Sequence, residues 1–344
     1  MERTNRSRQP AFVSVAAKLV VNVHDLNNEA STGNVMDIRT VAMVDNDGKR
    51  FEAPAISGRM IKHWHLSAMR ELALERGLPL CDGCRREEPV RPGRYDADAG
   101  AVRQVRVSEG EAVEQCVICD AHGYLIAQSA GGGRSRGGKR AADAEQAQEE
   151  VTKGTSDRRN SRAMFSWALP VLDSEYATTQ AVHTRVSASG QMGETANSES
   201  GQMLFYKSYA SQTVGLVATL DLERIGFIES AQEFVLDEDE WQQRVEVAVE
   251  AFRALLSGRM GASLSHALPH SDCRELLVAL SPRGPLAVPT SPIYDDWVVK
   301  TAGFLSNDAE LLLFGIDVPA GLKQNVRVFQ HIGDLFDNLL AGLK

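Results

Sequence analysis

The chain begins with a long alternating run that commits it to a β-sheet. Between residues 12 and 23 (FVSVAAKLVVNV), every second residue is apolar: Val13, Val15, Ala17, Leu19, Val21 and Val23. Because successive side chains of a strand point to opposite faces, these six share one face. The run therefore predicts a long, half-buried strand.

A second alternating run, at residues 35–44 (VMDIRTVAMV), follows a polar loop at residues 24–34 (HDLNNEASTGN). Turn-forming residues between two alternating runs are typical of a hairpin, so we predict one here with a protruding tip. A DNDG turn at residues 45–48 then leads to a predicted helix.

The predicted helix separates its apolar and basic residues. Ser57 is a good N-cap, and an apolar stripe at helical spacing follows it: Ile61, Trp64, Ala68 and Leu72. The basic side holds Arg59, His63 and Arg70, flanked by Lys62. His63 and His65 diverge on a helix, so they do not form a chelating pair. Near the helix start the basic face favours an anion such as phosphate, although an ordinary solvated face is the alternative.

Two cysteine pairs lie in residues 80–160, a segment with little apolar content of its own. They are CDGC (Cys81 and Cys84) and CVIC (Cys116 and Cys119). With 31 residues between the pairs, this spacing predicts a tetrahedral zinc site with four thiolate ligands, which is structural because its shell is closed. Disulfides and a redox CxxC are the alternatives, and His122 is a weaker candidate to replace one cysteine. We expect Cys273 to be a small buried apolar residue.

Charge and hydropathy restrict the class of protein. The net charge is -9 over 344 residues, but residues 1–163 carry +2 and residues 164–344 carry -11. The negative net charge argues at first against a nucleic-acid partner, because phosphate binding depends on Lys and Arg. These basic residues, however, are concentrated in the first half of the chain. No run of 18 apolar residues occurs and the first ten residues lack a secretory h-region, so we expect a cytoplasmic protein with no membrane partner.

The remaining patterns complete an element order. Strands are predicted at residues 162–172, 181–186, 203–222 and 275–281, and helices at residues 240–256 and about 322–343. The acidic run at residues 236–243 is typical of a helix start. Residues 129–150 are low-complexity and predict a flexible loop, whose basic part GRSRGGKR is either a plain linker or a weak nucleic-acid contact. The order of β, α, insertion, β, α and β is that of split βαβ domains such as the ferredoxin-like and RRM types, an α+β fold.

Four segments in this order resemble one family. They are HDLNNEASTGNVMDIRT, APAISGRMIKHW, HTRV before a Gly/Ser loop, and QMLFYKSYASQTVGLVATLDLERIG. With them the chain resembles the CRISPR-associated backbone subunits of Cascade-type (type I) interference complexes, in the DevR autoregulator group. The resemblance implies an RRM-like palm and a thumb hairpin at about residues 183–204. The family does not require the four cysteines, which predict an inserted zinc-binding subdomain from their own spacing. The palm would comprise residues 1–79 and 161–344, and the insertion residues 80–160.

The resemblance also implies a function. Members of this family polymerise along a CRISPR guide RNA and present it for pairing with target DNA, so the expected partners are CRISPR RNA, target DNA, further copies of the chain and other Cascade subunits. Most aromatic residues fall on core faces, which favours gripping the RNA backbone over reading bases. The candidate RNA ligands are Asn27, Asn28, Asn34, Arg59, Lys62, His63, Arg162, His183, Met192 and Arg259.

Two other functions compete with a non-catalytic guide carrier. An RRM-fold endoribonuclease would use His24, His63 or His183 as general acid and base. No sequence motif unites these histidines, and neither a P-loop nor a GxSxG or HExxH motif is present. The other alternative is a zinc-stabilised transcriptional regulator, which would bind duplex DNA.

Overall fold

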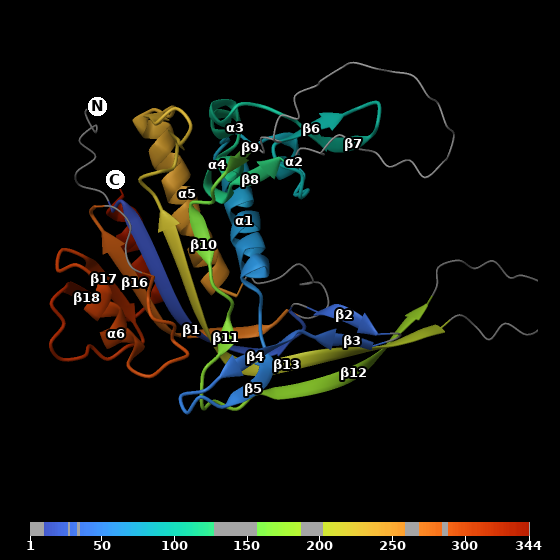
Figure 1. The fold of residues 1–344 in the computed structure, drawn as a ribbon, viewed down its shortest axis with the longest axis vertical. Coiled ribbons are helices and arrows are strands. Elements are labelled where there is room, and N and C mark those ends of the chain that lie inside the picture. Colours follow the sequence, from blue (N-terminus) through green and yellow to red (C-terminus); the bar gives the residue numbers. More distant parts are fainter. Residues whose placement is uncertain are drawn as a thin grey trace, which may run out of the picture.

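The computed structural model describes residues 10–26, 28–32, 35–126, 157–186, 202–258, 268–283 and 288–343. It is a mixed α/β structure built on one large sheet (Figure 1). The central strand β1 (Phe12–His24) pairs antiparallel with β13 (Gln202–Asp221) on one side and with β16 (His270–Ser281) on the other. Beyond β16 the sheet continues with β17 (Glu310–Phe314) and β18 (Asn325–Phe329).

Helices cover both faces of this sheet. On one face α1 (Gly58–Glu75) and α5 (Glu238–Leu256) lie side by side, and α7 (Ile332–Ala341) packs beside α5 (Figure 1). On the other face α6 (Trp297–Phe304) forms a second, smaller apolar cluster that includes Ala16 of β1. The sheet is therefore the middle layer of three.

Both helices of the main layer form where the sequence predicts them. The Ser57 hydroxyl caps α1 by accepting a hydrogen bond from the Met60 amide. The α5 helix begins at Glu238, two residues before the predicted start, because Asp237 caps it by accepting from Glu240 N–H. Its first turn carries the predicted acidic run, and an apolar stripe on one side of the helix is buried: Trp241, Val245, Ala248, Phe252 and Leu255.

The first strand is more deeply buried than its alternation predicts. Five residues face the main core as predicted: Val13, Val15, Ala17, Leu19 and Val21. Ser14 and Ala16 on the opposite face are buried too, because that side of the sheet is also covered. The prediction of a half-buried strand is therefore wrong for the first half of β1. Val23 is 54% exposed, since the pairing register shifts after Val21 and Val23 has a φ of 52°.

The predicted hairpin between residues 12–23 and 35–44 does not form. Within residues 24–34, predicted as loop, β2 (Asn28–Thr32) pairs with β3 (Val35–Ile38), and β3 pairs parallel with β13. The second half of the run is a separate strand, β4 (Thr40–Val44), which forms a hairpin across the DNDG turn with β5 (Arg50–Pro54). The alternation predicted strands correctly, but β1 pairs with the distant strands β13 and β16, and β3 pairs with β13 as well as with its neighbour β2.

On the far side of β13, three short partners follow one another along its length. They are β10 (Ala163–Phe165), β11 (Leu169–Pro170) and the longer β12 (Ala177–Val186), all antiparallel to β13. The end of β13 that pairs with β12 extends beyond β1, whose last pair is His24 with Ala210. The two strands therefore project together from the sheet (Figure 1).

The C-terminal region differs from its prediction. Residues 325–329 (NVRVF) form the edge strand β18 instead of the start of a helix, because they alternate and pair with β17. Only α7 forms from the predicted final helix. The strand predicted at residues 275–281 starts five residues earlier, and α6 and β17 are additional elements.

The cysteine-bearing segment shares the main core instead of forming its own. It contains α2 (Asp82–Arg85), α3 (Glu109–Gln115), α4 (Val117–His122) and the hairpin of β6 (Gly93–Asp96) with β7 (Ala101–Gln104). Apolar side chains of α3 and α4 belong to the same buried cluster as α1 and α5. The expectation of a segment with little apolar content therefore fails for α4.

Two short hairpin-like pairings complete the structure, one inside this segment and one before α5. β8 (Tyr124–Ile126) pairs with β9 (Asp157–Arg159), and β14 (Phe227–Ile228) with β15 (Glu233–Phe234). None of the helices in the described residues is long and apolar enough to cross a membrane.

Candidate functional site

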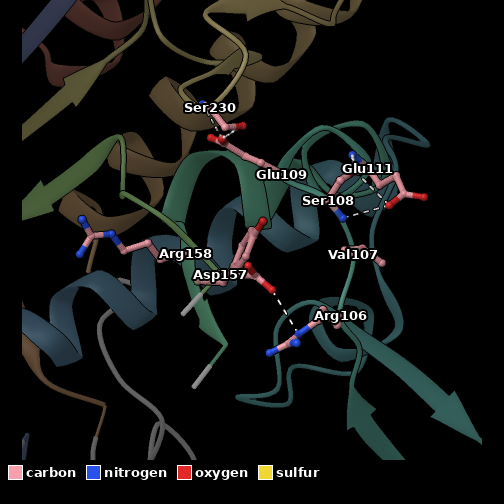
Figure 2. A pocket seen from close by; sticks show the side chains of 9 residues that line it. Arg106, Val107, Ser108, Glu109, Glu111, Asp157, Arg158 and Ser230 are labelled. Carbon is pink, nitrogen blue, oxygen red and sulfur yellow. Dashed lines mark hydrogen bonds and ion pairs between the residues drawn. The ribbon is translucent and has the colours of Figure 1, made fainter. Parts of the chain in front are cut away.

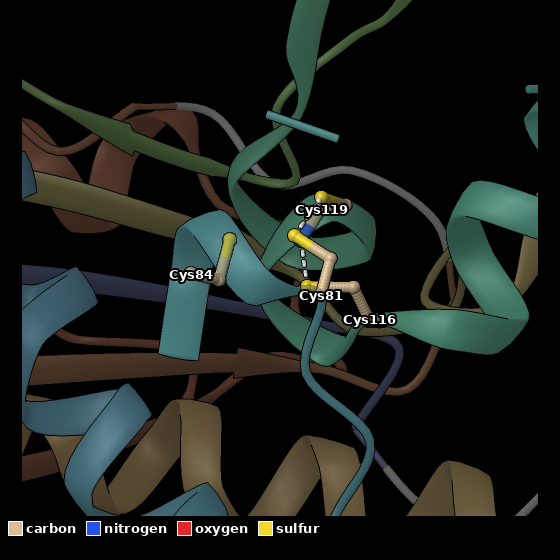
Figure 3. Close-up of side chains that lie close together, drawn as sticks. All are labelled: Cys81, Cys84, Cys116 and Cys119. Carbon is tan, nitrogen blue, oxygen red and sulfur yellow. Dashed lines mark hydrogen bonds between the residues drawn. The ribbon is translucent and has the colours of Figure 1, made fainter. Parts of the chain in front are cut away.

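The four cysteines of the two CxxC pairs converge as the sequence predicts. Their sulfur atoms lie within 4.8 Å of one another, and three of the four residues are buried (Figure 3). Each pair opens a short helix. Cys81 stands at the N-cap position of α2, which holds Cys84, and the Cys116 side chain caps α4 by accepting a hydrogen bond from the Cys119 amide. Neither helix directly follows a strand, as a redox CxxC would require, so the structure does not favour that alternative.

The cluster has the dimensions of a metal site. The Sγ atoms of Cys81 and Cys119 are 3.8 Å apart. A tetrahedral site with metal–sulfur bonds of about 2.3 Å has sulfur atoms about 3.8 Å apart, whereas a disulfide needs about 2.05 Å. All five cysteines are free thiols. The four cysteines of the cluster are therefore a group that can bind a metal ion.

Neighbouring groups already favour a thiolate in the cluster. Hydrogen bonds from the Cys116 and Cys119 side chains hold the pKa of Cys81 below its ordinary value, against its partial burial. The Gly93 amide also donates to Cys81 Sγ, at 3.5 Å. Cys273 lies apart in β16, and burial raises the pKa of its thiol to about 12, as befits the predicted apolar role.

His122 does not belong to the cluster of sulfur atoms. Its Nε2 lies 3.0 Å from Nδ1 of His65, whose Nε2 is 2.9 Å from the Ala248 carbonyl oxygen in α5. Since that carbonyl only accepts, His65 donates from Nε2 and accepts at Nδ1 from His122. Burial lowers the pKa of His65 to about 4, and burial also holds the pKa of His122 well below its ordinary value. The two imidazoles are a neutral link between α1, α4 and α5.

A buried ionic network, which the sequence reading missed, fastens the same region. Asp120 of α4 binds Arg159 at 2.5 Å and Arg244 of α5 at 2.9 Å, and all three side chains are fully buried. Arg244 also donates to the Val113 carbonyl, and Asp120 accepts from the Gly226 amide. One feature of the sequence could have indicated this network: Arg244 is a charged residue next to the buried apolar stripe of an amphipathic helix.

The predicted basic face of α1 is accessible in part. Arg59 and His63 are exposed, and Lys62 is half-buried. Burial, together with the charge of Arg91, lowers the pKa of Lys62 to about 8. Both effects disfavour the charged ammonium group of Lys62. An anion bound beside it would offset them by raising its pKa.

The other predicted RNA ligands are scattered. Arg162 is 2% exposed and ion-paired with Glu229 at 2.8 Å. His183 lies on β12, and Asn28 starts β2. Three further candidates lie outside the described residues: Asn27, Asn34 and the thumb residue Met192. Arg259 also lies outside them.

A polar pocket of about 500 Å³ opens beside α3, between β9 and the loop at Ser230 (Figure 2). Its carboxylates are engaged: Glu109 binds Arg159 and Ser230, and Asp157 binds Arg106. Burial raises the pKa of Glu109, but hydrogen bonds from Ser230 outweigh it and hold the pKa below the usual range. An ionised carboxylate of this kind cannot donate a proton, so the pocket offers no general acid there.

The three histidines considered for catalysis are not gathered in one site. His24 is buried next to Gln212, His183 is bonded to Tyr209, and His63 is exposed on α1. None of the contacts among the described residues joins two of these histidines.

Comparisons with known proteins agree on one family. The family model described as "CRISPR-associated negative auto-regulator DevR/Csa2" matches residues 15–302. A protein of Methanocaldococcus jannaschii named "CRISPR-associated protein Cas7/Cst2/DevR" is 24% identical over 320 residues, covering 87% of this chain and 90% of that protein. A protein of Thermoproteus tenax with the same name is 25% identical over 328 residues, covering 90% and 88%.

A solved structure has a similar fold. A chain of a "CRISPR RNA-guided surveillance complex, pre-nicking" superposes with a TM-score of 0.50 at 13% sequence identity, covering 97% of this chain and 100% of that chain. At this identity the similarity concerns the fold alone. It matches the mixed α/β architecture described above.

Proposed function

Because the chain belongs to the CRISPR-associated negative auto-regulator DevR/Csa2 family, we propose that it is a non-catalytic backbone subunit of a Cascade-type complex. In this role it binds CRISPR RNA, polymerises along it with further copies of itself, and presents the guide for pairing with target DNA beside other Cascade subunits. It works in the cytoplasm. The names of the relatives, which refer to Cas7, support the assignment.

The observation that carries this proposal is the projecting hairpin. Residues 202–209 of β13 have no partner in β1 and pair with β12 instead, from Val186 with Gln202 to Thr179 with Tyr209. An arm of this kind is the thumb expected at about residues 183–204. A thumb of one subunit on the palm of the next is a heterologous contact, which propagates along a helix instead of closing as a dimer.

The order of strands supports an RRM-like palm. Along the chain the main elements are β1, α1, β10, β13, α5 and β16, and in the sheet the strands lie in the order β16, β1, β13 and β10. This is the arrangement of two interleaved βαβ units, with both crossover helices on one face. The palm then comprises residues 1–79 and 161–344, and residues 80–160 are an insertion, of which the described helices α3 and α4 pack in the same core as α1 and α5.

The basic face of α1 is the proposed grip on the RNA backbone. Arg59, Lys62 and His63 lie on it, and the described residues place no carboxylate in an ion pair with any of them. Arg162 is left out because its burial with Glu229 gives a phosphate no access. The contacts of Asn27, Asn28, Asn34, His183, Met192 and Arg259 stay predictions.

We test the RNA grip with Arg59→Ala and Lys62→Ala. Each should weaken binding of all single-stranded sequences alike and lower the salt slope by roughly one unit for each lost phosphate contact. Glu71→Ala, an exposed position on the same helix, serves as the control. Unchanged affinity and slope in both variants would mean that the face is merely solvated.

Assembly is tested by the length of the particles. RNA that copurifies with the chain should derive from CRISPR repeats, and mass photometry should show growth in steps as the RNA lengthens. Deleting residues 187–201 should leave a folded chain that binds RNA weakly and does not polymerise. A dimer of fixed mass, whatever the RNA length, would refute the proposal.

The metal that we propose for the four cysteines is structural zinc. Four thiolates at tetrahedral separations close the coordination shell, so no position is left for a substrate. Metal analysis should give about one zinc per chain, and Cys81→Ser should lower it. Since α4 shares the main core, the same variant should also lower the melting temperature, whereas Cys273→Ser should keep the zinc.

Two alternatives are separated by simple assays. Endoribonuclease activity would appear as guide-RNA cleavage that disappears in His63→Ala. The family description contains the word auto-regulator, which favours a role as a zinc-stabilised regulator as the second candidate. That role predicts tight, sequence-specific binding of duplex DNA, whereas a guide carrier prefers single-stranded RNA with little sequence preference.

A further inference from the structure

The projecting hairpin carries a ring cluster on one face, formed by His183, Phe205 and Tyr209. His183 of β12 is paired directly with Phe205 of β13, and their rings stack at a centroid distance of 5.3 Å and an interplanar angle of 18°. Tyr209, two positions nearer than Lys207 to the palm, places its hydroxyl 3.0 Å from His183 Nε2. Phe205, Lys207 and Tyr209 share a face because they alternate along one strand.

This ring cluster does not belong to a core. All three rings are half-buried, and neither Phe205 nor Tyr209 takes part in the apolar clusters that the described residues form. The cluster lies beyond the last pair of β1, so only the neighbouring strands of the arm support it. A cross-strand ring pair does stabilise a hairpin, but it does not by itself explain three rings left partly open to solvent.

The rings are held in place before any ligand arrives. The hydrogen bond between Tyr209 and His183 restricts the rotation of both rings, and the stacking on Phe205 restricts the plane of the His183 ring, to which the Tyr209 ring is tilted by 44°. Lys207 lies 5.9 Å from the Tyr209 ring and is ion-paired with buried Asp25, which anchors the cluster to the chain after β1. Preorganised rings lose little conformational entropy on binding.

We propose that the ring cluster is a stacking site for one nucleobase of bound single-stranded RNA. Stacking suits a carrier of arbitrary guides, because every base has a π-face and the contact needs no sequence-specific hydrogen bond. The site rests on the proposed function and deepens it. It also revises the expectation that the aromatic residues lie on core faces and leave only backbone contacts.

The opposite face of the same arm provides a matched control. Tyr206 is 38% exposed and pairs directly with Val182, also exposed, so an aromatic residue of the same strand is available on the other side. Phe205→Leu keeps the apolar volume and removes the π-face, and Tyr206→Leu makes the same change one residue away. Melting temperatures should confirm that both variants fold.

The test measures binding of short single-stranded RNA, intact or with one abasic nucleotide at each position in turn. For the natural chain we expect one abasic position to weaken binding about 5- to 150-fold, the range found for base–aromatic stacking. Phe205→Leu should weaken intact RNA by a similar factor and abolish the sensitivity to that abasic position, whereas Tyr206→Leu should behave as the natural chain.

The outcomes separate the two proposals. If the natural chain binds no RNA, the proposed function fails. If it binds RNA tightly but no abasic position matters, or if Tyr206→Leu and not Phe205→Leu removes the sensitivity, the stacking site is refuted while the guide-binding role stands.

Discussion

The cysteine-bearing segment and the projecting hairpin differ in how their polar and apolar side chains are buried. In the first, Asp120, Arg159 and Arg244 are fully buried and satisfy one another, and four thiols converge inside the main core. In the second, rings at Phe205 and Tyr209 are ordered by their neighbours and yet stay partly open. Buried polar groups that complete one another indicate structural support, whereas apolar surface left uncovered on an arm indicates a place for a ligand.

The sharpest way to break this contrast is to remove the carboxylate at the centre of the ionic network. Asp120→Ala leaves two buried guanidinium groups without their counter-ion, so we expect the free energy of unfolding to fall by about 3–5 kcal/mol in chemical denaturation. The control is Asp157→Ala, which breaks an ion pair with Arg106 whose side chains are 41% and 56% exposed. That variant should lose less than about 1 kcal/mol. Equal losses would contradict the assignment of the network as the main fastening.

Acid should loosen the cysteine-bearing segment next. Burial lowers the pKa of His65 to about 4, below its ordinary value of 6.5. The unfolded chain therefore takes up this proton first, and stability present above pH 6.5 is lost as the pH falls toward 4, by up to about 3 kcal/mol for this group.

The His65 effect is measured as the pH dependence of the unfolding free energy. His65→Gln, which can still donate to the Ala248 carbonyl, should flatten part of the slope between pH 6.5 and pH 4. His24 keeps a contribution in both proteins, because burial lowers its pKa to about 4 as well. An identical slope in the variant and the natural chain would show that the imidazole is not kept neutral by the fold.

The smallest effect on stability is expected in the hairpin. Tyr209→Phe removes only the hydroxyl that bonds to His183, a partly solvated contact, so the free energy of unfolding should change by less than about 1 kcal/mol. Denaturation monitored by circular dichroism measures it. A loss as large as that of Asp120→Ala would make the arm a part of the core and erase the contrast between the two regions.

Local patterns of the sequence predicted where helices and strands form. Pairing between segments that are distant in the sequence could not be predicted from such patterns. The Ser57 cap and the apolar stripe of α1 depend on residues within a few positions, and the cysteine spacing is itself a signature. The partners of β3 could not be predicted, because alternation specifies a strand but not which strand lies beside it.

The roles of the candidate site residues also depend on partners that are distant in the sequence. Arg162 was predicted to be a phosphate ligand, but its side chain is buried and pairs with Glu229, 67 residues away. The link between Asp120 and Arg244 spans 124 residues and leaves only one trace in the sequence, a charge beside an apolar stripe. From the sequence alone, a charged residue in such a position is as compatible with an exposed side chain as with a buried one. Only the position of its partner in the fold decides between them.

The length of β13 gives the hairpin a mechanical character. One continuous strand runs from the centre of the sheet, where it pairs with β1, to the end of the arm. At about 3.3 Å per residue, its first eight residues, 202–209, reach roughly 26 Å past the pair of His24 with Ala210. The strand that forms the arm therefore also carries Val214 and Leu216 of the main core, so a force on the outer end of the arm acts on the backbone at the centre of the sheet.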